Sequence, residues 1–236
     1  MRRIAALSVL FVLASGSFAF AAVTGAEAPK GEEPLLITNA GQGPGGKMGR
    51  LLVTRSEAVK DMTYNAEPKP EDLEKGGYKT MLVVIGSSAK GLGASGITID
   101  QEIERLNAMM AKAKELKIQI IAAHIEGKAR RGKPGSADER SIDAILPGAD
   151  HIVVNKEGDE DGKFTKFAEE HKIPITYLDS AMDLNAFAKA IYGFFALADA
   201  LHLRFVNRIN LFPTMTSLCK NRLKSLNQFS ITQMFF

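Results

Sequence analysis

The sequence predicts an α/β fold of three layers, in which a mostly parallel sheet carries helices on both faces. From Pro34 onwards, short apolar runs alternate with segments of helical period, which is the pattern of strands joined by crossover helices. The run Met81–Ile85 is apolar at successive positions, as expected for a strand that is buried on both faces. Because such crossovers are right-handed, the topology is limited to a Rossmann-like or a flavodoxin-like domain.

In the first half of this domain, we expect strands at 35–38, 62–66 and 81–85. A helix is expected over 47–60, because Met48, Leu51 and Leu52 recur at helical spacing. Prolines leave room for only a short helical turn at 71–75. Thr98 followed by Gln101 has the spacing of a capping box and predicts a helix that runs to residue 116.

In the second half, we expect strands at 118–125, 151–154 and 173–178. Ser136 and Glu139 form a second capping-box pattern, which opens a helix that ends at Pro147. Two further helices are expected, over 164–171 and from residue 180 to about 200. All these elements belong to one domain, residues 34–200.

The two ends of the chain differ from this domain. Arg2 and Arg3, a short apolar run and the small residues Ala19 and Ala21 have the pattern of a cleavable export signal over 1–21; an uncleaved anchor is the alternative, and 22–33 is expected to be a flexible lead-in. Residues 201–236 carry five bases and no acid. This basic tail is interpreted as sequence foreign to the domain, with a membrane-surface helix or a partner-binding tail as alternatives.

The charge balance excludes one class of partner. The formal net charge is +3, but the signal contributes +2 and the tail +5, so the domain between them carries −4. A mildly acidic domain argues against nucleic acid as a partner. The single cysteine excludes an internal disulfide bond. We expect an exported protein that is periplasmic and soluble after signal-peptide cleavage, without a stable membrane span.

Two glycine-rich loops, over 41–47 and 86–96, suggest where a ligand binds. Each follows a predicted strand and precedes a helix, so both are expected at the carboxyl edge of the sheet. Backbone N–H groups at a helix N-terminus attract anions. The predicted contacts to a small anionic ligand are Gly43, Gly46, Lys47, Ser87, Ser88, Lys90, Gly91, Arg130 and Arg131. The alternative is that these loops are tight turns that pack helices against strands.

The first loop does not predict a nucleotide cofactor. Gly41, Gly43 and Gly46 satisfy the spacing of a dinucleotide fingerprint. The acidic residue expected about twenty positions later is missing from a suitable strand end, and Lys47 is followed by Met48, where a P-loop requires Ser or Thr. No cofactor is therefore predicted.

Catalytic and metal-binding residues are less clearly indicated. His124 follows a predicted strand at the same edge and is a candidate general base, although such a histidine more often serves as a structural hydrogen-bonding residue. Asp161 is a second candidate acid or base. The loop around Asp159 begins like a calcium loop, but Ala168 stands where a bidentate glutamate is required, so no metal is predicted.

Four segments carry a family resemblance: 36–42, 86–97, 124–132 and 161–165. Together they resemble an exported bacterial family known only as a domain of unknown function (DUF6305-like), over roughly residues 34–195. The resemblance implies the domain limits and an exported location, and it implies no activity. We therefore rank ligand binding first, a non-catalytic interaction protein second, and a hydrolase or transferase that uses His124 or Asp161 third.

Overall fold

The computed structural model describes residues 23–193. The predicted signal over 1–21 and the basic tail over 201–236 lie outside these residues. The first elements along the chain are β1 (Val23–Gly25), β2 (Leu35–Ala40), α1 (Gly45–Ser56), β3 (Met62–Tyr64), α2 (Pro70–Gly76), β4 (Thr80–Ile85), α3 (Ala89–Ser95) and α4 (Ile99–Glu115). They are followed by β5 (Gln119–His124), η1 (Gly127–Arg130), α5 (Ala137–Ile145), η2 (Leu146–Gly148), β6 (His151–Asn155), η3 (Lys156–Asp159), α6 (Lys163–His171), β7 (Ile175–Leu178) and η4 (Ala181–Asp183). A last helix begins at Leu184 and fills the remaining described residues.

The predicted α/β class is confirmed. The sheet has seven strands in the order β1-β7-β6-β5-β4-β2-β3. Strands β2 to β7 are parallel, and β1 is antiparallel to β7. Among the parallel strands, the first lies between the second and the third, which is the flavodoxin-like order.

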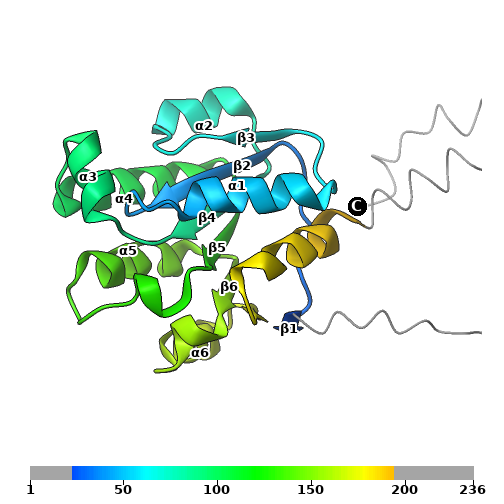
Figure 1. The fold of residues 1–236 in the computed structure, drawn as a ribbon. Coiled ribbons are helices and arrows are strands. Elements are labelled where there is room, and N and C mark those ends of the chain that lie inside the picture. The colour runs from blue at the N-terminus through cyan, green and yellow to red at the C-terminus, as the bar shows by residue number, and fades with distance from the viewer. Residues whose placement is uncertain (1–22, 194–236) are drawn as a thin grey trace, which may run out of the picture.

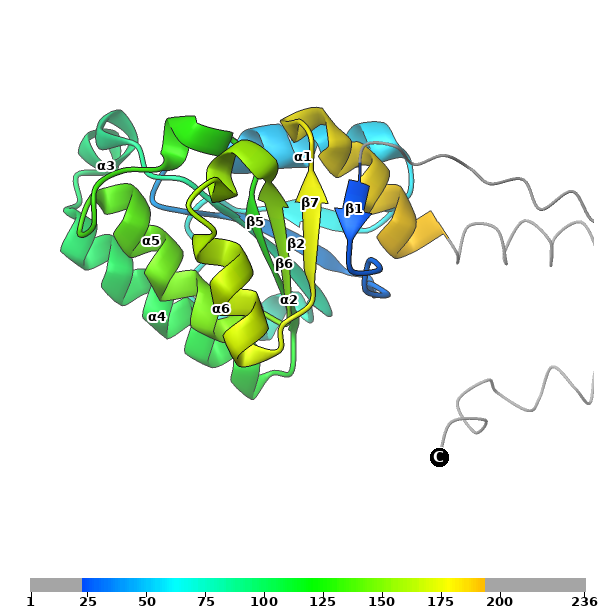
Figure 2. The ribbon, with the colours of Figure 1, turned by 90° about the horizontal axis from the view of Figure 1, so that it is seen from below.

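Helices cover both faces of the sheet (Figures 1 and 2). One face packs against α2, α4, α5 and α6, around residues such as Leu106, Ile142 and Phe164. The other face packs against α1 and the last helix, through Leu52, Leu184 and Phe187. Strands β2, β4 and β6 are buried along their whole length, which explains the run of three or more successive apolar residues in each of them.

Two expectations from the sequence are wrong. The lead-in over 22–33 was expected to be flexible, whereas Val23–Gly25 forms β1 on the edge of the sheet. Residues 89–95 were read as part of a glycine loop, whereas they form α3. The reason is that Ser88 caps this helix: its hydroxyl accepts a hydrogen bond from the Gly91 amide at 3.1 Å.

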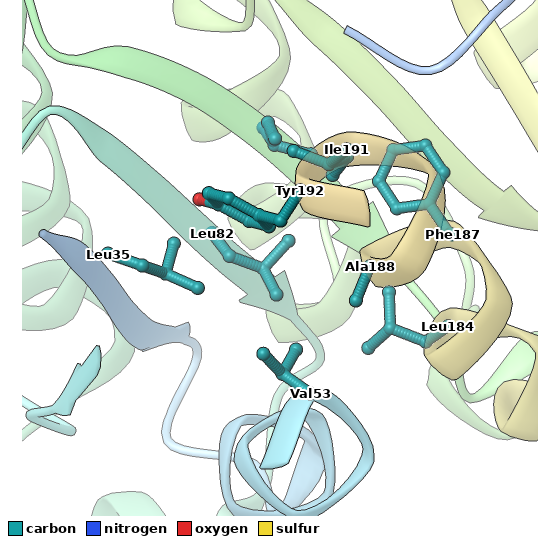
Figure 3. Close-up of a pocket in the computed structure, with 9 residues that line it drawn as sticks. Leu35, Val53, Leu82, Leu184, Phe187, Ala188, Ile191 and Tyr192 are labelled. Carbon is teal, nitrogen blue, oxygen red and sulfur yellow. The ribbon is translucent and has the colours of Figure 1, made fainter. Parts of the chain in front are cut away.

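The core between α1 and the last helix contains a small cavity of about 10 Å³ (Figure 3). Its lining is apolar and includes the ring of Tyr192. Burial raises the pKa of the Tyr192 hydroxyl to about 12. A space of this size holds at most one water molecule, so it is a packing defect rather than a ligand site. Within residues 23–193, none of the helices combines the length and apolar character needed to cross a membrane.

Candidate functional site

The two glycine loops meet at the carboxyl edge of the sheet, as predicted. They leave the neighbouring strands β2 and β4, and their helices α1 and α4 cover opposite faces. The Ser88 amide donates to the Gly41 carbonyl at 2.9 Å, and Gln42 pairs with Ser87 in an isolated β-bridge. This is the switch point of the sheet, where open α/β folds bind ligands.

Close approach of the backbones explains two of the predicted glycines. A Cβ atom on Gly43 would lie 2.2 Å from the Gly86 carbonyl oxygen, and one on Gly91 would lie 1.9 Å from the Gln42 carbonyl oxygen. Neither contact leaves room for a side chain. Both residues therefore serve the packing of one loop against the other.

Carboxylates of the protein itself occupy several of the amides that were expected to hold a ligand. Glu102 is fully buried on α4 and accepts hydrogen bonds from the Gly41 amide at 2.9 Å and from the Gln42 side chain at 3.1 Å. Arg105 neutralises it through an ion pair of 2.8 Å. Asp138, in the first turn of α5, accepts a hydrogen bond of 2.7 Å from the Ser87 amide.

The two predicted arginines are also engaged within the fold. Arg130 donates to the Ser87 carbonyl at 2.7 Å and to Glu126 at 3.2 Å. Arg131 forms ion pairs of 2.7 Å with both Glu139 and Asp161. These arginines hold the loops around the site together, and their guanidinium groups are already paired.

Ion pairing keeps the carboxylates around Arg131 ionised. The hydrogen bond from Arg131 lowers the pKa of Asp161 to about 2. Burial raises the pKa of Glu139, but hydrogen bonds from Arg131 and Lys163 outweigh it and lower that pKa to about 2. A carboxyl group with so low a pKa has no proton to give near neutral pH, so this geometry does not favour Asp161 as a general acid.

His124 is likewise a structural residue in this arrangement. It is fully buried, its Nε2 atom lies 3.0 Å from the Arg130 carbonyl oxygen, and its ring packs 5.1 Å from that of Phe164. Burial lowers the pKa of His124, and the contact with the Arg130 carbonyl opposes that shift. Because its hydrogen bond goes to the backbone, the imidazole is not presented to a substrate.

The amino end of α1 is the part of the edge that remains unengaged. The helix begins without a side-chain cap and without an acidic residue in its first turn. Within the described structure, the amides of Gly45, Gly46 and Lys47 donate no hydrogen bond. The side chains of Lys47 and Lys90 are exposed and form no ion pair with any residue between 23 and 193.

Two buried polar atoms without a hydrogen-bond partner border this end of α1, Asn39 Oδ1 and Glu126 Oε2, and a third, Ser87 Oγ, lies on the neighbouring loop. Cβ atoms on Gly45 and Gly86 would lie 2.7 Å and 3.0 Å from Glu126 Oε2, so this oxygen sits between the two loops. The sequence interpretation missed Glu126, and it also missed Glu102 and Asp138. For Glu102 and Asp138 a signal was available, since helices that follow parallel strands begin at the carboxyl edge and bring their first-turn acids there.

The described residues contain no group of three or more His, Cys, Asp or Glu side chains that could hold a metal ion. The acidic loop before α6 has another role. Asp159 accepts hydrogen bonds from the amides of Phe164 at 2.7 Å and Thr165 at 3.1 Å, so it satisfies the first turn of that helix.

Comparison with solved structures finds similar folds at low similarity. A GDP-L-fucose synthetase from Naegleria fowleri is 9% identical with a TM-score of 0.37, over 56% of this chain and 53% of that chain. The acetyl xylan esterase AlAXEase is 10% identical with a TM-score of 0.36, over 67% and 97%. The esterase EstA from Pseudoalteromonas sp. is 11% identical with a TM-score of 0.32, over 72% and 100%. The chain thus spans about half the length of the synthetase.

A search of curated proteins finds no match. A family model, described as a domain of unknown function (DUF6305), matches residues 32–192. This match covers strands β2 to β7 and the helices of both layers, up to residue 192 of the last helix. Strand β1 lies outside it. The chain therefore belongs to the DUF6305 family.

Proposed function

We propose that this domain is a binding module that holds the anionic group of a small ligand at the amino end of α1. The observation that supports the proposal is the set of three free amides at Gly45, Gly46 and Lys47, next to the exposed Lys47 ammonium group. Free amides and the helix dipole together favour negative charge. The buried Ser87 hydroxyl, on the neighbouring loop, has no other partner among the described residues.

This proposal involves fewer ligand-contacting residues than the one made from the sequence. Arg130 and Arg131 are engaged in ion pairs, and Ser88 and Gly91 bond to each other. These residues shape the loops, and they are not proposed as direct contacts. Lys47 and the α1 amides are proposed to carry the interaction, with Lys90 at the start of α3 contributing a second exposed positive charge.

Glu126 sets the strength of this interaction. Its Oε2 atom borders Gly45, so a bound anion would lie near a second negative charge. Repulsion between like charges at about 5 Å is worth on the order of 1 kcal/mol or more near a protein surface. Replacement Glu126→Gln is therefore expected to strengthen anion binding about tenfold, whereas Lys47→Ala weakens it.

The test is a titration with inorganic phosphate at constant ionic strength, followed by the thermal midpoint of unfolding. At 100 times its Kd, phosphate should stabilise the protein by about 2.7 kcal/mol. The control variant is Lys117→Ala, which removes a charge at the opposite end of the sheet, just before β5. If phosphate, sulfate and acetate all leave the midpoint unchanged, or if Lys117→Ala weakens the response as much as Lys47→Ala, the proposal fails.

A non-catalytic interaction protein is the second candidate. Leu51 on α1 and Met182 in η4 are large apolar side chains with 50% and 56% of their surface exposed. The last helix, which follows η4 directly, contacts α1, since the Asn185 side chain donates to the Leu52 carbonyl. If the surface binds another protein, Leu51→Asp should abolish the association in analytical ultracentrifugation without changing the response to phosphate.

A further inference from the structure

A buried histidine connects the amino-terminal strand to the core of the sheet. His151 begins β6 with 1% of its surface exposed, and its Nε2 atom lies 2.8 Å from the hydroxyl of Thr176 on β7. That hydroxyl donates to the carbonyl of Ala26, directly after β1, at 3.0 Å. The imidazole therefore supports the contact that holds the end of β1.

This chain of bonds determines where the imidazole carries its proton. The Thr176 hydroxyl uses its hydrogen on Ala26, so it can only accept from His151. The proton of neutral His151 is thus on Nε2, and Nδ1 is a lone pair without a partner among the described residues. Protonation would add a charge and a donor at Nδ1, in a place where neither is compensated.

The groups around His151 are apolar or neutral. Ile121 on β5 is its register partner, Thr176 lies on β7, and the ring of Phe187 on the last helix is 5.7 Å away. The neighbouring titratable groups on these elements, Glu27 after β1, Asp150 before β6 and Lys189 on the last helix, are exposed. Burial alone lowers the pKa of His151 to about 4, without a contribution from any charged group.

The last helix and β1, which both lie close to His151, differ in how firmly they are held on the sheet. The last helix buries Leu184, Phe187 and Ile191 against the sheet. Strand β1 has three residues, two of them exposed, and lies at the edge of the sheet. Segments with few buried apolar contacts open first, so β1 is the element whose release can hydrate the ring.

We propose that protonation of His151 releases β1 from β7, so that segment 23–26 is an acid-sensitive clasp on the edge of the sheet. When the clasp opens, the outer edge of β7 loses its antiparallel partner. The unpaired N–H and C=O groups of an edge strand are a template for another extended chain. The proposal is independent of the anion site, which lies at the carboxyl edge near α1.

The pH range follows from linkage. The closed form keeps His151 neutral, with a pKa near 4, and the hydrated open form regains an ordinary value near 6.5. The closed form is therefore fully favoured above about pH 6.5, and it loses stability as the pH falls towards 4. In this range the population of the open form should rise by up to about tenfold per pH unit.

Hydrogen exchange of the purified protein between pH 7 and pH 4 tests the clasp, with rates corrected for the pH dependence of intrinsic exchange. Protection of segment 23–26 should fall up to about tenfold per pH unit below pH 6, and at every pH it should be lower than the protection of β4, which opens only by global unfolding. In His151→Phe, which keeps a ring but cannot titrate, the protection should not depend on pH. In Thr176→Val, which keeps the histidine and removes the bond to Ala26, the segment should be open at every pH.

His171→Gln is the matched control, because it removes an exposed histidine on α6 and should behave as the wild type. Constant protection of 23–26 in the wild type would overturn the proposal. The same acid response in His151→Phe as in the wild type would also overturn it, and so would protection of 23–26 equal to that of β4 at every pH, because the segment would then open only by global unfolding. Full protection in Thr176→Val at pH 7 would contradict the role given to the Thr176 hydroxyl.

Discussion

Removal of the Glu102 carboxylate should destabilise the domain strongly, because this group connects α4 to the first glycine loop. Its side chain is fully buried, and that of Arg105 is 16% exposed. Glu102→Ala breaks the ion pair and leaves the Gly41 amide and the Gln42 side chain without their acceptor. Removal of one partner of a buried ion pair typically costs about 3–5 kcal/mol, and we expect a loss in this range.

Equilibrium unfolding in urea measures this loss, with the free energy of unfolding extrapolated to zero denaturant. Glu104→Ala is the matched control: it removes an exposed glutamate two residues further along α4 and should change the free energy by less than about 0.5 kcal/mol. Glu102→Gln keeps the shape and one acceptor, so it should fall between the two. A loss below 1 kcal/mol for Glu102→Ala would refute the view that an internal carboxylate holds the loop.

The same variant offers a chemical rescue. Glu102→Ala leaves a space that a small carboxylate can fill, next to the Gly41 amide and the Arg105 guanidinium. Formate or acetate should therefore raise the thermal midpoint of the variant more than that of the wild type. An equal response in both proteins would contradict the assignment of this position as an anion site that the protein fills itself.

Three further predictions follow from the contacts around the site and the core. Gly43→Ala should lower the free energy of unfolding by about 1–3 kcal/mol or more, because its Cβ would meet a backbone carbonyl at 2.2 Å. Gly93→Ala lies in open space on α3 and should raise the free energy of unfolding by about 0.5–1 kcal/mol. Urea unfolding measures both changes. Leu184→Ala, at a fully buried position beside the small cavity, should cost about 3–5 kcal/mol in the same assay. The ion pair between Asp161 and Arg131 stabilises the protein fully at pH values above 4, the ordinary pKa of Asp161, and this stabilisation is lost as the pH falls through about 2. In Arg131→Met, an NMR titration should find the pKa of Asp161 close to 4.

The fold could be predicted from the sequence because its strands are buried on both faces. Five successive apolar residues of β4, Met81–Ile85, are buried. The Thr98–Gln101 capping box, with hydrogen bonds of 3.3 Å and 2.9 Å, marks the start of α4. Strand β1 could not be predicted. It has three residues, and its stability comes from β7, which lies about 150 positions away in the chain.

The meeting of the two glycine loops was predicted from the sequence, but the partners of their amides were not. The meeting of the two glycine loops follows from the strand order, and the Gln42–Ser87 bridge confirms it. The local pattern places the first-turn acids of α4 and α5 at this edge, but which amide each acid reaches depends on how these helices pack against the loops. For this reason Lys47 and Arg131 looked alike in the sequence, whereas Lys47 is exposed and Arg131 is paired with two carboxylates.

Native mass spectrometry in the presence of inorganic phosphate tests the central claim most directly. It compares the wild-type protein with Lys47→Ala and Glu126→Gln under identical conditions. A binding site at the amino end of α1 predicts one phosphate adduct on the wild type, a weaker adduct on Lys47→Ala and a stronger one on Glu126→Gln. Equal adduct levels on all three proteins, or none on any of them, would contradict the assignment of this helix end as a ligand site.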